Sequence, residues 1–190
     1  MARRLTRQEL GSLAESQVVE FKKSLSLTKE GLIALNAMVN ADGGKGLVLF
    51  GVEDDGTPYG IEHGNHDKAQ RSLVQHVQQK FDPRLLELNV ELLDCEGNLL
   101  LAASARRGKE IPYHEYDGRA YIREGTSKRV LTVDEKQRLV RRRRRDQHNG
   151  PWRCDRCGAW VGQFVSYAQT ESGMERRYDC ECGGEYWPET

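Results

Sequence analysis

The spacing of apolar residues along the first part of the chain alternates between helical and strand patterns. Thr6, followed three residues later by Glu9, is a capping-box pattern that predicts a short first helix. The segment VVEFK, from Val18, has the alternation of a strand. From Thr28, apolar residues recur at helical spacing and predict an amphipathic helix that ends at the DGG turn of residues 42–44.

The rest of the pattern predicts a sheet covered by helices. GLVLFGVE is apolar on both faces, as expected for a strand covered on both sides. A second helix is predicted over residues 67–81, before Pro83. Strands are predicted in LELNVELLD, GNLLLAASA, PYHEY and RAYIRE, with hairpin turns at CEGN and DG. Thr132 and Glu135 predict the start of a last helix, so we expect an α+β fold with helices on a mixed, mainly antiparallel sheet.

The chain has 190 residues, enough for one core and a small appendage. We expect a main domain at 1–137, an arginine-rich helix end and linker at 138–150, and a small unit at 151–190. The mean hydropathy is −0.73, and no apolar run approaches the roughly 18 residues of a membrane helix. The charged start MARRLTRQEL has no apolar segment behind it, so we expect no signal peptide, no membrane partner and a cytoplasmic location.

The formal net charge is zero, but the charge is unevenly distributed. Residues 1–137 contain 19 basic and 21 acidic side chains, residues 138–145 contain 6 basic and none acidic, and residues 146–190 contain 4 basic and 8 acidic. The five consecutive arginines Arg141, Arg142, Arg143, Arg144 and Arg145 repel one another unless an anion neutralises them. We expect them to contact phosphates without base preference, and a solvated helix end is the alternative.

Four of the five cysteines form two close pairs near the C-terminus. Cys154 and Cys157 are separated by 22 residues from Cys180 and Cys182, and each pair lies in a segment rich in glycine and charge. Paired thiolates at such turns are typical of a tetrahedral zinc site, and four of them fill the coordination shell. We therefore expect a C-terminal zinc ribbon with a structural zinc ion, and we expect Cys95 to be a buried bystander.

Carboxylates at two places along the chain are candidates for a metal site. Glu15 and Glu20 are five residues apart, and a third acid can come from the turn at residues 53–55, after the buried strand. Mg²⁺ and Mn²⁺ take such oxygen ligands, although acids beside a turn are more often solvated. Lys22 shares the face of Glu20 if the segment is a strand, so it either holds a phosphate or forms an ordinary ion pair.

Three segments occur in order over roughly residues 10–137: ESQVVEFKKS, IALNAMVNADGGKGLVLFGVEDDGTPYGI and IPYHEYDGRAYIREGTSKR. In all three the chain resembles the Schlafen-type AlbA-2 domain family. The resemblance implies an Alb-like α+β lobe that binds nucleic acid. In members with nuclease activity it also implies a three-carboxylate site that cleaves tRNA or rRNA with a divalent metal. By position, the three acids fall on Glu15, Glu20 and Asp54.

Further polar residues near these segments are candidates for phosphate contacts. They are Arg106, Arg107, Lys109, Arg123, Ser127 and Lys128. His114 is a candidate for acid–base chemistry, with a structural role as the alternative. Asn40, Gly43 and Gly44 are expected to form a turn, which is either structural or lies close to a phosphate.

We therefore predict an endoribonuclease that depends on Mg²⁺ or Mn²⁺ and acts on structured RNA such as tRNA. Glu15, Glu20 and Asp54 would hold the metal, and Lys22 and Arg123 would position the phosphate. Larger Schlafen nuclease cores pair two lobes, and because this chain has room for one, we expect a homodimer. The alternative is a non-catalytic DNA- or RNA-binding AlbA-2 regulator. Some relatives are labelled ATP-binding, but the sequence has no GxxxxGK(S/T) pattern.

Overall fold

The structure is a computed structural model that describes residues 2–62, 66–147, 163–170, 173–179 and 185–186, with side chains up to Arg142. The chain divides into two compact units, Met1–Lys136 and Gln137–Thr190. Among the described residues, no helix is both long and apolar enough to cross a membrane.

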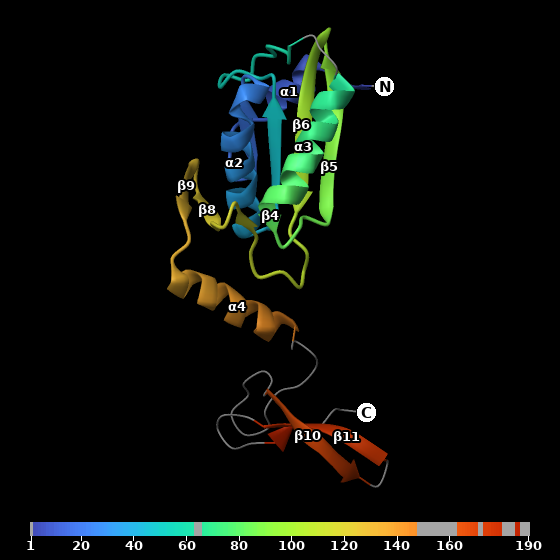
Figure 1. The fold of residues 1–190 in the computed structure, drawn as a ribbon, viewed down its shortest axis with the longest axis vertical. Helices are drawn as coiled ribbons and strands as arrows, with labels where there is room; N and C mark the ends of the chain where they lie inside the picture. The colour runs from blue at the N-terminus through green and yellow to red at the C-terminus, as the bar shows by residue number, and fades with distance from the viewer. Residues whose placement is uncertain (1, 63–65, 148–162, 171–172, 180–184, 187–190) are drawn as a thin grey trace. The chain divides into compact units, whose positions relative to one another are not determined.

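A five-stranded sheet forms the centre of the first unit (Figure 1). Its strands, in spatial order, are β1 (Arg3–Arg4), β5 (Glu87–Cys95), β6 (Asn98–Arg106), β3 (Lys45–Phe50) and β2 (Val19–Lys22). The edge strands β1 and β2 pair in parallel with their neighbours, whereas β5, β6 and β3 pair antiparallel. The sheet is therefore mixed, as predicted.

Helices cover the two faces of this sheet unequally. The larger core cluster lies under α2 (Thr28–Asn40) and α3 (His66–Lys80), which Figure 1 shows on the same side of the sheet. The smaller cluster, on the other face, includes Leu10 of the short α1 (Arg7–Ser12) and the buried Cys95. Val48 and Leu49 of β3 belong to different clusters, so this strand is buried on both faces, as predicted.

The local start and turn signals are confirmed. Thr6 and Glu9 form a complete capping box at α1. The side chains of Thr132 and Glu135 make the same reciprocal bonds at the start of α4 (Val133–Gln147). Between β5 and β6, Glu96 and Gly97 both have positive φ, at 53° and 87°. A two-residue hairpin turn requires this conformation, so CEGN forms the predicted hairpin.

Short pairings complete the first unit. They are β4 (Phe81–Asp82) with β7 (Glu115–Tyr116), and β8 (Tyr121–Glu124) with β9 (Ser127–Val130); a 3-10 turn, η1 (Leu25–Leu27), precedes α2. The predicted strand PYHEY is shorter than expected, because the backbone N–H and C=O of His114 bond to Asn40 instead of a neighbouring strand.

The second unit, taken by itself, contains an antiparallel sheet. Its strands are β10 (Gln163–Thr170), β11 (Gly173–Asp179) and β12 (Glu185–Tyr186), with β11 in the centre. The four cysteines predicted to bind zinc lie outside the described residues.

Candidate functional site

The edge strand β2 places Glu20 under the β8–β9 hairpin. Glu20 is in register with Val48 of β3, so it faces the side of the sheet covered by α2. It is only 5% exposed, and its carboxylate contacts three cations. The distances are 2.8 Å to Nζ of Lys22, 2.5 Å to Nη1 of Arg123 and 3.3 Å to Nζ of Lys128. We call these four residues the Glu20 cluster.

The cations keep the buried carboxylate ionised. Burial raises the pKa of Glu20, but the hydrogen bonds from Lys22 and Arg123, helped by the charge of Lys128, lower it below its ordinary value. Of the two alternatives for Lys22, the structure contains the ion pair. With three cations and one carboxylate, the Glu20 cluster has excess positive charge.

Arg123 is almost completely buried within the cluster, with a side chain that is 1% exposed. Its Nε donates to the carbonyl of Gly125, and its Nη2 is a buried nitrogen without a partner among the described residues. A direct contact between Arg123 and a phosphate would therefore require the hairpin to move. Lys128 is more accessible, with a side chain that is 32% exposed.

Glu15 is used differently from Glu20. Its Oε1 accepts a hydrogen bond from the backbone N–H of Phe21 at 3.0 Å, and the N–H of Ser16 donates to the carbonyl of Val19. Because β2 is an edge strand, these bonds satisfy backbone groups that no neighbouring strand pairs. The carboxylate of Glu15 thus caps the edge of the sheet.

The third predicted acid, Asp54, is exposed on the turn after β3. The N–H of Glu53 donates to the carbonyl of Thr57 across this turn, and Oδ1 of Asp55 accepts from the N–H of Thr57 at 2.8 Å. Within the described part of the chain, no three His, Cys, Asp or Glu side chains are placed to hold a metal ion. The Glu20 carboxylate also contacts three cations, so a Mg²⁺ or Mn²⁺ ion bound there would have to compete with them for its oxygens.

A protein-family model matches the part of the chain that contains the Glu20 cluster. The model of the Schlafen, AlbA_2 family matches residues 15–132, more than half of the chain. The chain belongs to this family. The matched AlbA_2 region includes Glu15, Glu20 and Asp54 together with the β8–β9 hairpin. No curated protein matches the chain.

The solved structures that are similar to the chain include the DIP2311 protein from Corynebacterium diphtheriae. The two sequences are 17% identical, and the superposition has a TM-score of 0.49. The match covers 81% of this chain and 30% of that one, so this chain spans less than a third of the length of the DIP2311 chain.

Two buried asparagines hold the segment that leads to Arg123 in the AlbA_2 domain. Nδ2 of Asn40 donates to the carbonyls of His114 and Tyr121, at 2.8 and 2.9 Å. Oδ1 of Asn36 accepts from the N–H of Tyr121 at 2.9 Å. The turn pattern singles out Asn40 but not Asn36. The signal that indicates both is two amides four residues apart in the part of the helix that is otherwise apolar, from Gly31 on, since buried amides need partners.

His114 has the structural role that was the alternative to acid–base chemistry. It is 1% exposed, and its Nδ1 lies 2.6 Å from the carbonyl oxygen of Pro83. Burial lowers the pKa of His114, and the nearby positive charge of Arg107 acts in the same direction, against the Pro83 hydrogen bond. Arg107 is itself half-buried and donates to the carbonyl of Asn40.

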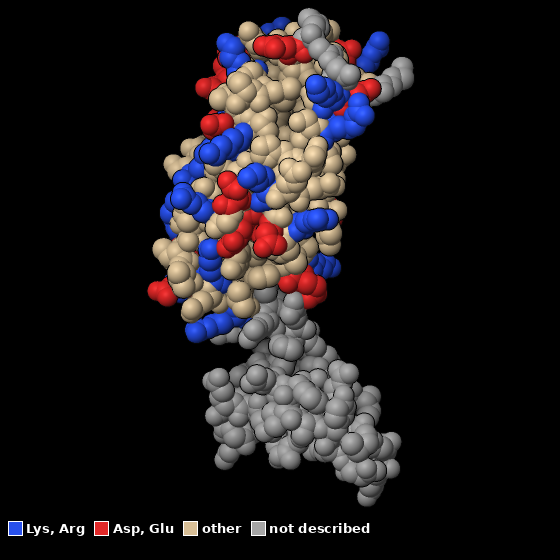
Figure 2. Space-filling view, in the orientation of Figure 1, with Lys and Arg blue, Asp and Glu red and all other residues tan. Residues whose placement is uncertain are grey.

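The other predicted phosphate contacts are mostly at the surface. Those that are exposed are Arg106, Lys109, Ser127 and Lys128 in the first unit, and Arg141 and Arg142 on α4. The side chains of Arg143, Arg144 and Arg145 lie outside the described residues. Figure 2 shows Lys and Arg gathered along the side of the first unit where β8 and β9 lie, with Asp and Glu between them.

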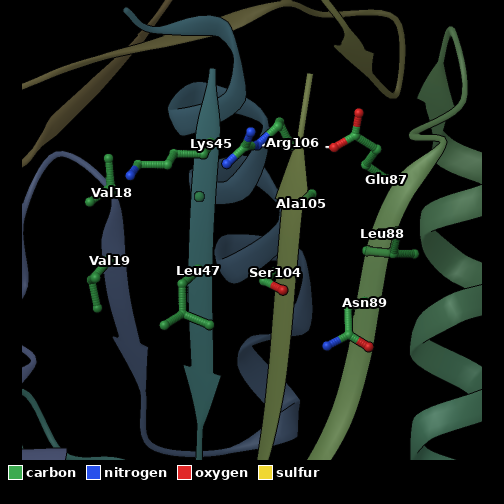
Figure 3. Close-up of a pocket in the computed structure, with 11 residues that line it drawn as sticks. Val18, Val19, Lys45, Leu47, Glu87, Leu88, Asn89, Ser104, Ala105 and Arg106 are labelled. Atoms are coloured by element: carbon green, nitrogen blue, oxygen red, sulfur yellow. Dashed lines mark ion pairs between the residues drawn. The ribbon is translucent and has the colours of Figure 1, made fainter. Parts of the chain in front are cut away.

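A separate groove of about 540 Å³ lies on the opposite face of the sheet from the Glu20 cluster. Val19, Leu47, Ser104 and Asn89 form one row in register across β2, β3, β6 and β5 (Figure 3). Of the predicted site residues, the groove includes Arg106, which pairs with Glu87 at 4.0 Å. The groove is therefore distinct from the predicted acid site.

Proposed function

We propose that this chain is a nucleic-acid-binding protein that prefers structured RNA such as tRNA. The observation that supports this proposal is the Glu20 cluster, in which three cations surround one carboxylate beneath an exposed hairpin. A partly exposed site with more positive than negative charge attracts phosphate groups. Membership of the AlbA_2 family supports the same class of ligand.

In this proposal the hairpin provides the accessible contacts. Lys128 reaches from β9 toward Glu20 at 3.3 Å but keeps about a third of its side chain exposed. Ser127, beside it, is also exposed. Arg123 is buried beneath them and acts by holding β8 against β2. The surface residues therefore contact phosphate, and the buried arginine positions them.

The arginine run is the second proposed region of phosphate binding. Arg141 and Arg142 are exposed on α4, and further arginines follow up to Arg145. A helix with charges at consecutive positions places cations around its axis. Such a helix follows a phosphate backbone and adds affinity that falls with salt.

The test is the affinity for tRNA measured over a range of salt concentrations. Replacing residues 141–145 with glutamine should reduce the slope of log K against log salt by roughly 0.9 for each duplex phosphate that the variant no longer neutralises. Lys128→Gln should weaken binding and reduce the slope by the equivalent of about one phosphate. Lys45→Gln is the matched control, because Lys45 is an exposed cation on the opposite face of the sheet. Parent protein that does not bind tRNA at low salt would refute the proposal.

An endoribonuclease is the second candidate function. It is favoured by the position of Glu15, Glu20 and Asp54, which all lie within the region that the family model matches. The ion pairs of Glu20 oppose it, because a metal would have to displace Lys22 or Lys128 from the carboxylate. The test incubates tRNA and Mn²⁺ with the parent and with Glu20→Ala. Cleavage by the parent alone supports the nuclease, and binding without cleavage by the parent supports the binder.

We also propose that two copies of the chain associate as a homodimer. A single lobe per chain would place two positive surfaces on one RNA if two copies associate. Sedimentation equilibrium of the full chain, with and without tRNA, measures this directly. A monomer at micromolar concentration in both conditions would contradict it.

A further inference from the structure

Tyr59 lies on a turn whose backbone is fixed to the end of β3. The carbonyl of Gly51 accepts hydrogen bonds from the N–H groups of both Tyr59 and Gly60, at 2.8 and 2.9 Å. Gly51 has a φ of 91°, and a Cβ there would lie 2.9 Å from the carbonyl carbon of Gly60. A bridge between Val52 and Pro58 closes the same turn. The position of Tyr59 is therefore set by β3.

The ring of Tyr59 is exposed although its backbone is fixed. Tyr59 is 56% exposed and is the one aromatic residue among the large exposed apolar side chains of the described residues. Nζ of Lys23 lies 4.4 Å from the ring centroid, and Glu53 holds Lys23 there through an ion pair of 2.8 Å. A cation thus covers part of the ring, and more than half of the residue's surface stays open to solvent.

The charges around this ring favour a neutral ligand over a phosphate. Three acids, at residues 53–55, lie on the same turn and repel phosphate groups. Lys23, which directly follows the neighbouring strand β2, is the cation at the ring. A nucleotide bound here would therefore place its base over the ring and its phosphates toward Lys23.

We propose that Tyr59 is a stacking platform for an unpaired nucleobase of bound RNA. This inference rests on the proposed nucleic-acid binding and adds a preference for single-stranded segments. A flat π surface stacks on any base, so the contact tolerates different sequences. Lys23 contributes through its position over the ring and through its charge beside the flanking phosphate.

The experiment compares two fluorescently labelled ligands of equal length: a short single-stranded oligoribonucleotide and an abasic oligomer with the same ribose–phosphate backbone. Binding to the full chain is measured by anisotropy for the parent, Tyr59→Ala and Tyr59→Phe. Leu86→Ala is the matched control, because Leu86 is 87% exposed and apolar but lies before β5, away from this turn. Tyr59→Phe keeps the ring and loses only the hydroxyl.

We expect Tyr59→Ala to weaken binding of the base-containing oligomer by roughly 5- to 150-fold, the range for one stacked base. Tyr59→Phe and Leu86→Ala should bind it like the parent, and all four proteins should bind the abasic oligomer equally. If Tyr59→Ala binds base-containing RNA like the parent, or weakens both oligomers equally, stacking is wrong while RNA binding stands. If the parent binds neither oligomer nor tRNA, the proposed function fails together with this inference.

Discussion

Nη1 of Arg123 donates to Oε2 of Glu20 at 2.5 Å, although the two residues are 103 positions apart in the chain. Both side chains are buried, with 1% and 7% of their surfaces exposed. This pair connects the edge strand β2 to the β8–β9 hairpin, and it sets the position of the surface residues that we propose contact RNA.

Arg123→Met should lower the free energy of unfolding by about 3–5 kcal/mol, because it leaves the carboxylate of Glu20 buried with weaker partners. Lys128→Met should cost about 1 kcal/mol or less, because Lys128 is partly solvated. The measurement is urea unfolding followed by far-UV circular dichroism. All three tryptophans lie at positions 152–187, in the second unit. The unfolding transition followed by their fluorescence should therefore be the same for both variants as for the parent. Equal costs for the two variants would contradict a buried pair.

Because the pKa of Glu20 is lowered in the folded protein, we predict that the free energy of unfolding decreases in acid. The unfolded carboxyl titrates near 4.5, whereas the folded one titrates lower, so the unfolded state takes up the proton first. The stabilisation from Glu20 is complete above about pH 4.5 and is lost as the pH falls through the folded pKa. The melting temperatures of the parent and of Glu20→Gln should therefore converge as the pH falls below this value. A constant difference down to strong acid would contradict the prediction.

The lowered pKa of His114 predicts a second loss of stability, which begins at a higher pH than that of Glu20. Burial lowers its pKa from the ordinary 6.5, so protonation favours the unfolded state. Stability should fall as the pH drops below 6.5, until the folded pKa is reached. Arg107 and Asp82 act on the same ring with opposite signs, and burial is the largest effect. In thermal melts over a series of pH values, His114→Gln should remove the decrease in melting temperature below pH 6.5. The decrease at lower pH that comes from Glu20 should remain.

Asn40→Ala should be strongly destabilising for its size. It removes the partners of the Tyr121 carbonyl and the His114 N–H, which are backbone groups of the segment leading to Arg123. Each buried unsatisfied group costs about 1–3 kcal/mol, so we expect a loss of about 2–6 kcal/mol for the two groups. Hydrogen exchange at the amides of β8 should accelerate. Asn89→Ala, at an exposed position of β5, is the control and should change neither quantity.

We also predict one zinc ion per chain, bound by Cys154, Cys157, Cys180 and Cys182, which lie outside the described residues. Atomic absorption of the purified full chain measures the ion. Cys154→Ser should abolish binding, because a tetrahedral structural site needs all four ligands. Cys95→Ser is the control, since Cys95 is buried in the core of the first unit. A full chain without zinc would contradict the prediction.

Local signals in the sequence were sufficient for most of the elements. The capping boxes at Thr6 and Thr132 define where two helices begin, because each needs residues only three positions apart. The turn at Glu96 and Gly97 fixes one hairpin for the same reason. The PYHEY segment was overpredicted, since its alternation is local but its backbone partners are side chains of α2.

The sequence by itself determined the α+β class, most helix and strand positions, and the order of residues that match the AlbA_2 family. Only the tertiary structure decided that Glu20 contacts Arg123, that Glu15 caps a strand edge, and that Lys22 forms an ion pair. These contacts depend on which strand lies at the edge of the sheet and on a hairpin some 100 residues later. Spacing along the chain describes neighbours within a helix or hairpin, whereas burial and pairing between distant segments are set when the sheet assembles.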